Sequence, residues 1–251
     1  MIDAAMHNGW LYPDWPVPGN VRALVTTRAG GVSRGAYASL NLGAHVGDDP
    51  AAVAENRRRL VEAADLPVAP VWLSQVHGLG VARLTKESAP GIEADAALTD
   101  TPGVVCAVLT ADCLPVLFCN RAGTRVAAAH AGWRGLAGGV LEASVDALET
   151  SPEDLHVWLG PAIGPAAFEV GDEVREAFVA HNPLADRAFA PSARGRWLAD
   201  LYSLARLRLA ACGVRSVHGG DYCTLTDARR FYSYRRDGET GRMASLVWFS
   251  N

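Results

Sequence analysis

The feature that most restricts the fold of this chain is an apolar stretch from Val104 to Cys119, interrupted in its middle by Asp112 and Cys113. Its two halves, "GVVCAVLT" and "PVLFCN", contain β-branched and aromatic residues and predict two strands. The interruption comes well before the roughly 20 apolar residues that a membrane-spanning helix needs, so no membrane span is expected. Three roles are open for Cys113 in this position: a packed core residue, a nucleophile or a metal ligand.

Strand-like and helix-like segments alternate along the rest of the chain. Apolar segments typical of strands are found at residues 21–27, 68–78, 124–132, 155–161 and 243–250. Helical patterns cover about 49–64, 133–148, 172–180 and 199–213, the first opened by an N-cap and first-turn pair, Asp49 and Pro50. Residues 28–43, rich in glycine and small polar residues, predict a long loop of the kind that often carries function. The alternation favours a mixed α/β sheet covered by helices.

Composition narrows the choice of partner. The net charge of −4 shows no basic excess, so we expect a small-molecule substrate and neither nucleic acid nor a membrane surface. The first 20 residues contain an acid and three prolines where a secretory signal needs basic residues and an apolar segment, which indicates a cytoplasmic protein. The five cysteines form no CxxC pair, and we expect free thiols. Without repeats or linker-like segments, residues 1–251 are expected to form a single domain.

Three residues could form a metal site. His77, Cys113 and His130 each lie at or beside the end of a strand-like segment, and two imidazoles with one thiolate are three zinc ligands that leave a fourth position for water. They match no short zinc motif. The residues alone also allow buried, hydrogen-bonded side chains, or a Cys113 nucleophile activated by either histidine.

A resemblance to a known family bears on this choice. The segments "TTRAGGVSRGAYASLNLGAHVGDDPAAVAENRRRL", "LSQVHG", "EADAALTD", "TADCLPV", "AAAHAGWRG", "LGPAIGPAAFEVGDEV" and "FYSYRRDGETGRMASLVWF" follow one another between Val21 and Phe249. They resemble the successive blocks of the YfiH-type family, variously labelled laccase-domain, polyphenol oxidase or purine nucleoside phosphorylase. The resemblance implies a four-layer α/β/β/α fold with two mixed β-sheets. It also implies zinc bound by His77, Cys113 and His130.

The activity that the resemblance implies is phosphorolysis of adenosine, inosine and methylthioadenosine to free base and ribose 1-phosphate, with adenosine deamination as a related reaction. The expected partners are a purine nucleoside and phosphate, and the expected state is a monomer or a weak homo-oligomer. A phosphate dianion is commonly held by arginines beside small-residue loops. Arg28, in the loop "TTRAGGVS", and Arg206 are the first candidates, Arg57 and Arg134 weaker ones. The family pattern around Arg206 usually carries amides where this chain has Ala205 and Arg208, which puts any contact made by those amides in doubt.

Other residues are candidates for proton transfer and substrate contact. Asp112 and Asp95 could shuttle a proton in deamination; Asp112 could equally orient a ligand imidazole, and Asp95 could cap a turn. Gln75 lies two residues before His77 and could contact substrate. Tyr234 and Arg235 could close the pocket from the C-terminal side.

Two other enzymes and one non-enzymatic role remain open. A cysteine hydrolase would use Cys113 with a histidine. A copper-dependent polyphenol oxidase with several coppers is disfavoured by the supply of only seven histidines, although a His2Cys site also suits copper. The non-enzymatic role is that of a metal-binding interaction module.

Overall fold

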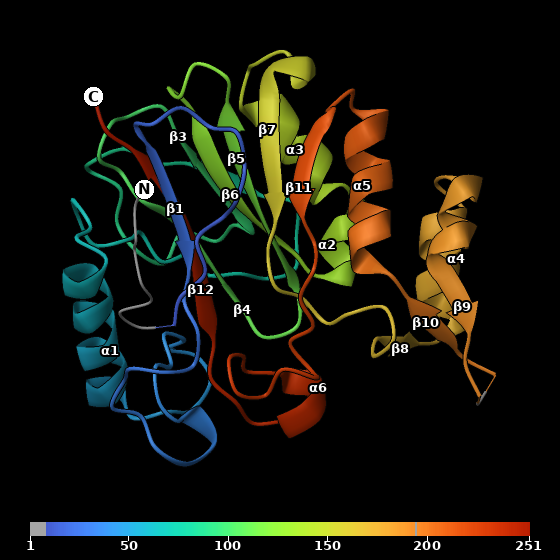
Figure 1. Ribbon diagram of the computed structural model, residues 1–251, viewed down its shortest axis with the longest axis horizontal. Coiled ribbons are helices and arrows are strands. Elements are labelled where there is room, and N and C mark those ends of the chain that lie inside the picture. Colours follow the sequence, from blue (N-terminus) through green and yellow to red (C-terminus); the bar gives the residue numbers. More distant parts are fainter. Residues whose placement is uncertain (1–8, 194) are drawn as a thin grey trace.

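The computed structural model describes residues 9–193 and 195–251, and within them two β-sheets pack face to face with helices on both outer faces (Figure 1). Helix α1 (Pro50–Ala63) covers the smaller sheet. Helices α2 (Trp133–Gly138), α3 (Val140–Ala147) and α5 (Leu201–Ala211) cover the larger one. The expected α/β/β/α fold is confirmed.

The larger sheet has six strands in the order β11-β7-β5-β6-β3-β2. Their bounds are β2 Val81–Arg83, β3 Ala96–Thr99, β5 Leu114–Asn120, β6 Val126–Ala131, β7 Leu155–Leu159 and β11 Ser216–Gly219. The sheet is mixed, because β11 runs parallel to β7 and β2 runs parallel to β3, while the other pairs are antiparallel.

The smaller sheet contains β1 (Val21–Val25), β12 (Met243–Phe249) and β4 (Cys106–Thr110), with β12 in the centre. Both of its pairs are antiparallel, so of the two stacked sheets only the larger one is mixed. A third, peripheral sheet consists of β8 (Glu169–Val170), β10 (Trp197–Ala199) and β9 (Phe189–Pro191), beside α4 (Asp172–Val179). Short helical segments complete the structure: α6 Tyr234–Asp237, and 3-10 turns at Gly35–Tyr37, Pro152–Asp154 and Pro183–Ala188.

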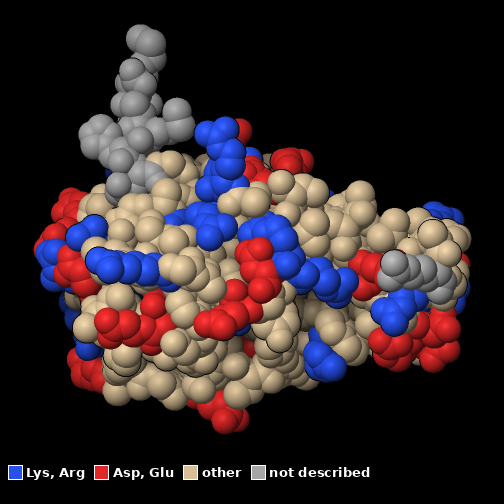
Figure 2. Space-filling view, turned by 90° about the horizontal axis from the view of Figure 1, so that it is seen from below, with Lys and Arg blue, Asp and Glu red and all other residues tan. Residues whose placement is uncertain are grey.

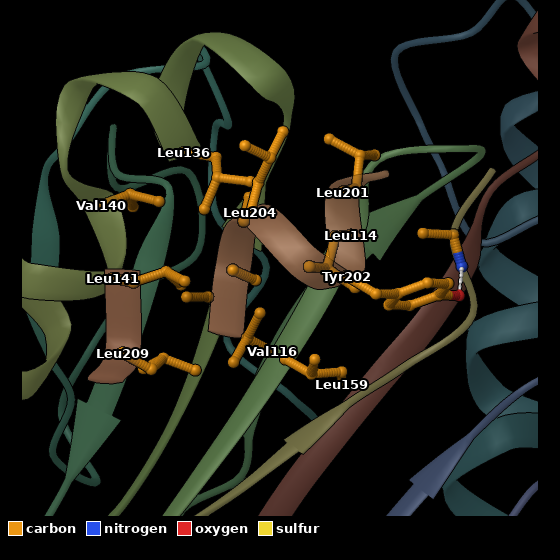
Figure 3. Close-up of a cluster of buried hydrophobic side chains, with 14 of the residues drawn as sticks. Leu114, Val116, Leu136, Val140, Leu141, Leu159, Leu201, Tyr202, Leu204 and Leu209 are labelled. Atoms are coloured by element: carbon orange, nitrogen blue, oxygen red, sulfur yellow. Dashed lines mark hydrogen bonds between the residues drawn. The ribbon is translucent and has the colours of Figure 1, made fainter. Parts of the chain in front are cut away.

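Apolar side chains fill each space between the layers. Leu114 and Val116 of the larger sheet pack against Leu204 and Leu209 of α5 (Figure 3). A second cluster, including Val108 of β4 and Leu117 of β5, lies between the two sheets, and a third lies between the smaller sheet and α1. Because alternate residues of a strand point to opposite faces, both faces of each stacked sheet contribute to a core.

The apolar stretch of residues 104–119 forms the connection between the two sheets. Strand β4 belongs to the smaller sheet and β5 to the larger, so the chain turns from one layer to the other at Ala111, Asp112 and Cys113. Asp112 has a φ of 92°, which is uncommon for a residue other than glycine. The acid and the thiol therefore occupy a sharp corner at the end of the sheets, which explains why they interrupt an apolar sequence.

Two predicted elements differ in the structure. The predicted strand at 68–78 is wrong, since this segment forms only an isolated bridge between Ser74 and Glu93. The predicted helix at 133–148 divides at Gly139, whose φ of 110° ends α2 before α3 begins. Helix α1 begins as predicted, with the Asp49 side chain accepting a hydrogen bond from the Ala51 N–H.

Surface charges of both signs are mixed on the face shown in Figure 2, where basic and acidic side chains alternate over short distances. Among the described residues, no helix is both long enough and apolar enough to cross a membrane. The five cysteines are free thiols, as expected.

Candidate metal centre

His77, Cys113 and His130 converge at one end of the larger sheet. His77 lies in the segment before β2, Cys113 at the corner before β5, and His130 near the end of β6. Strands β5 and β6 are antiparallel with Leu114 opposite Ala131, so the beginning of one lies beside the end of the other. One ligand atom from each residue lies within 4.8 Å of the others, and the Cys113 Sγ is 3.9 Å from the His77 Nε2.

The buried carboxylate of Asp95 holds both histidines in place. Its Oδ1 accepts hydrogen bonds from the His77 backbone N–H at 2.9 Å and pairs with the His130 Nδ1 at 2.8 Å. Its Oδ2 accepts from the N–H groups of Val76 (3.2 Å) and Gly78 (2.6 Å). Because Nδ1 of His130 is engaged, Nε2 is the nitrogen left for a metal. Asp95, and not Asp112, is thus the carboxylate that orients a candidate ligand imidazole.

The charges of these groups are strongly coupled. Burial would raise the pKa of the Cys113 thiol, but His130 and His77 lower it to about 6. Burial would lower the pKa of His130, but Cys113 and Asp95 raise it to about 9. Burial would also raise the pKa of Asp95, yet hydrogen bonds from His130, Gly78 and Val76 outweigh it and the pKa lies below its ordinary value. A thiolate is therefore available at neutral pH, either as a ligand or as a nucleophile.

Gly132 lies against two of the three candidate ligands, His77 and Cys113. A Cβ at this position would lie 2.8 Å from the His77 Cδ2 and 3.1 Å from the Cys113 Sγ. Any side chain would therefore displace a candidate ligand. The two imidazoles and the thiolate fit a zinc ion with a free fourth position, and they fit copper as well.

A pocket of about 340 Å³ lies over the three ligands. Its lining residues are His45, Gln75, His77, Leu109, Thr110, Ala111, Cys113, His130, Tyr234 and Arg242. In the part of the chain that the structure describes, His77, Cys113 and His130 form the one group of three or more His, Cys, Asp or Glu side chains arranged to share a metal. A multicopper cluster would need further groups of this kind.

The carboxylate of Asp112 is engaged with the C-terminal part of the chain. Its Oδ1 accepts a hydrogen bond from the Thr224 hydroxyl at 2.5 Å, and its Oδ2 accepts from the Ser233 hydroxyl at 3.0 Å and the Arg235 N–H at 2.7 Å. The carboxylate therefore fixes the corner beside Cys113 to the C-terminal loops. Neither Asp112 nor Asp95 lines the pocket.

The structure does not bring Arg28, Arg57 or Arg206 into the pocket lining. Their guanidinium groups donate to backbone carbonyls: Arg28 to Ala38 and Ala228, Arg57 to Leu42, and Arg206 to Val217 and Gly219. The Arg134 guanidinium stacks on the Trp133 ring.

Gln75 lines the pocket, but its amide is already paired. Its Nε2 donates to the Leu109 carbonyl at 2.9 Å, and its Oε1 accepts from the Leu109 N–H at 2.8 Å. Tyr234 lies at the pocket with its side chain largely exposed, while the Arg235 guanidinium donates to the Glu169 carbonyl. Of the C-terminal pair, Tyr234 is the one at the pocket.

Three polar pocket residues were not predicted from the sequence: His45, Thr110 and Arg242. Thr110 ends β4 and Arg242 directly precedes β12, and the two strands are paired with Thr110 opposite Met243. For Thr110 and Arg242 the available signal was a position beside an apolar strand, but only the pairing of β4 with β12 places these two residues together. His45 lies in a loop, where the sequence carried no such signal.

The fold and sequence match known proteins over almost the whole chain. A family described as "Multi-copper polyphenol oxidoreductase laccase" matches residues 22–250. A Pseudomonas aeruginosa protein named purine nucleoside phosphorylase is 62% identical over 245 residues, covering 97% of this chain and 100% of that protein. Escherichia coli "Purine nucleoside phosphorylase YfiH" is 59% identical, covering 95% and 98%. The crystal structure of a Neisseria meningitidis protein aligns with a TM-score of 0.93 at 53% identity, covering 96% and 99%. The chain therefore belongs to the YfiH-type family, whose laccase-like description covers almost its full length.

Proposed function

We propose that this chain is a zinc-dependent purine nucleoside phosphorylase. The observation that carries the proposal is the convergence of His77, Cys113 and His130 in one pocket. The names of the relatives at 62% and 59% identity support the choice of reaction. The proposed substrates are adenosine, inosine and methylthioadenosine with inorganic phosphate, and adenosine deamination is proposed as a second activity. We expect a monomer or a weak homo-oligomer.

The residues present fit zinc better than the several coppers of the family description. A thiolate with two imidazoles is a common donor set for catalytic zinc, and Asp95 fixes the His130 tautomer that such a site requires. When bound, zinc supplies a Lewis acid and lowers the pKa of a coordinated water. A single copper at the same ligands is the alternative occupant.

The proposed reaction joins a phosphate oxygen to C1′ of the ribose as the bond between C1′ and the base nitrogen breaks. The proton of hydrogen phosphate balances the charge of the departing base, and the products are the free base and ribose 1-phosphate. The protein must bind the phosphate, hold it against C1′ and exclude water, since these effects supply most of the catalysis in reactions of charged groups. We assign Asp95 the role of positioning the ligands in this scheme, and Asp112 that of fixing the corner beside Cys113.

One observation favours a second candidate, a cysteine hydrolase. The pKa of Cys113, after the opposing effect of burial, is lowered by His130 and His77 to about 6, as an activated nucleophile requires. A chelator distinguishes the two candidates, because it removes zinc but spares a metal-free thiol nucleophile.

The test is metal analysis of the purified protein together with adenosine turnover, measured with and without phosphate. We expect one zinc per chain, ribose 1-phosphate as product, and loss of activity with a chelator. Cys113→Ala should remove metal and activity together, whereas Cys212→Ala, a change at a partly exposed thiol on the end of α5, should alter neither. Base release that is independent of phosphate excludes phosphorolysis, and stoichiometric zinc in Cys113→Ala excludes the ligand assignment.

A further inference from the structure

The pocket contains polar groups that the metal ligands do not use. Thr110, Tyr234 and Arg242 line it beside His45, and among the described residues no Asp or Glu belongs to the lining. The proposed reaction brings a phosphate dianion to this pocket, and a binding site for that dianion must offer N–H or O–H donors that are otherwise unpaired.

Arg242 is held in a fixed orientation. Its backbone N–H donates to the Asn41 Oδ1 at 2.9 Å, and its Nη1 donates to the carbonyls of Thr240 (2.9 Å) and Gly241 (3.0 Å). A Cβ at Gly43 would lie only 2.8 Å from the Arg242 Cγ, so the side-chain stem packs tightly against that loop. Holding the guanidinium in this way lowers the entropy cost of binding a ligand.

The remaining edge of the Arg242 guanidinium is free. Within residues 9–193 and 195–251, Nε and Nη2 have no hydrogen-bond partner, and neither is among the buried unpaired atoms, so both keep contact with solvent. These two N–H groups form the parallel fork that binds two oxygens of one phosphate. Of the arginines considered, Arg28, Arg57 and Arg206 instead donate to backbone carbonyls outside the pocket lining.

The Thr110 side chain provides an independent observation. Thr110 is 2% exposed and lines the pocket, and its hydroxyl has no hydrogen-bond partner in the part of the chain that the structure describes. A buried hydroxyl without a partner is unfavourable unless a ligand or a water supplies one. Because Thr110 is paired with Met243 across β4 and β12, its backbone lies beside that of Arg242.

We propose that the Nε and Nη2 edge of Arg242 and the hydroxyl of Thr110 form the binding subsite for inorganic phosphate, with His45 beside it. The proposal rests on the proposed phosphorolysis, for which it names the phosphate-binding residues. It assigns to Arg242 the role that the sequence suggested for Arg28, Arg206 and Arg57. The bound dianion would thereby lie in the same pocket as the zinc ligands, as attack on a nucleoside held there requires.

The experiment is calorimetric titration of zinc-loaded protein with inorganic phosphate. Arg242→Lys keeps the positive charge and removes the fork, and we expect it to weaken phosphate binding by about 10- to 100-fold. Thr110→Val replaces the hydroxyl by a methyl group of similar size and should weaken binding by about 5-fold or more. Arg22→Lys, on the exposed face of β1, is the matched control and should bind as the wild type does. Zinc content and circular dichroism establish that each variant is folded.

The outcomes separate this proposal from the proposed function. Unchanged phosphate affinity in both Arg242→Lys and Thr110→Val, or no phosphate binding by the wild type, overturns the subsite. If Arg242→Lys weakens phosphate binding but the wild type cleaves no nucleoside, the subsite stands and phosphorolysis is wrong. If phosphorolysis proceeds with the KM for phosphate unchanged in Arg242→Lys, the function stands and the subsite is wrong. A parallel titration with adenosine 5′-monophosphate tests the source of the dianion, and tighter binding of the nucleotide through Arg242 overturns the assignment to inorganic phosphate.

Discussion

Replacement of Asp95 by Asn tests whether this carboxylate prepares the metal centre. The wild-type carboxylate faces four donors: the N–H groups of Val76, His77 and Gly78, and the ring nitrogen of His130. Asn has the same shape but only one acceptor oxygen, so the donors on one side lose their acceptor. At about 1–3 kcal/mol for each buried unpaired donor, two such losses destabilise the fold by about 2–6 kcal/mol. The misplaced histidines should weaken zinc binding by about 10- to 100-fold.

Two assays measure these effects separately. Urea unfolding of chelator-treated protein gives the free energy of unfolding without metal, and competition with a chromogenic chelator gives the zinc affinity. Asp14→Asn, a change at an exposed acid, is the control. A loss of less than about 0.5 kcal/mol in Asp95→Asn, the range of ordinary surface substitutions, together with wild-type zinc affinity would refute the reasoning.

The effect of Asp95→Asn on stability should depend on pH. Burial raises the pKa of Asp95, but the hydrogen bonds outweigh it, and the folded-state pKa lies below the unfolded value. The carboxylate therefore stabilises the fold fully above the unfolded pKa of about 4, and this contribution is lost as the pH falls through the folded pKa. The stability difference between wild type and Asp95→Asn should accordingly shrink below about pH 4.

Three further predictions concern the candidate metal ligands and the corner at Asp112. Gly132→Ala should lower zinc affinity by at least about 10-fold, because its Cβ would meet the His77 ring and the Cys113 sulfur. Gly19→Ala, whose Cβ would have no atom within 4 Å, should leave the affinity unchanged. Equal zinc affinities of the two variants, measured by chelator competition, would contradict this prediction. In metal-free protein, the rate of Cys113 alkylation by iodoacetamide should rise with pH, with its midpoint at about pH 6, and added zinc should suppress the reaction. A midpoint near the ordinary thiol pKa would show that the histidines do not stabilise the thiolate. Thr224→Val removes one hydrogen bond to Asp112 and should lower the free energy of unfolding, measured with urea, by about 1–3 kcal/mol, while zinc still binds. Complete loss of zinc from this variant would show that Asp112 contributes directly to the metal site.

The parts of the fold that were predictable depend on local signals. Asp49 and Pro50 mark the start of α1 because a cap and a first-turn proline act within a few residues. The segment 68–78 has the composition of a strand, yet it lacks a partner strand along its length and forms one bridge. Strand formation depends on a neighbour that composition does not reveal.

The site was predictable to a different extent. Spacing alone left His77, Cys113 and His130 open to several interpretations, and the family resemblance selected a metal site. The hydrogen bond by which Asp95 orients His130 was not predicted, because it depends on the pairing of β3 with β6, which places the two residues side by side. The position of Arg242 in the pocket could not be predicted for the same reason, since it depends on the pairing of β12 with β4.

The central position of β12 has a consequence for biosynthesis. This strand separates β1 from β4 in the smaller sheet, and it follows every other strand in the sequence. During translation, the edges of β1 and β4 that pair with β12 remain unpaired until residues 243–249 leave the ribosome. Unpaired strand edges promote aggregation. Since Arg242 and Tyr234 are also translated late, the pocket is completed at the end of synthesis. A chain ending before Met243 should therefore be captured by chaperones or precipitate, and codon changes that slow translation near this strand should lower the yield of folded protein.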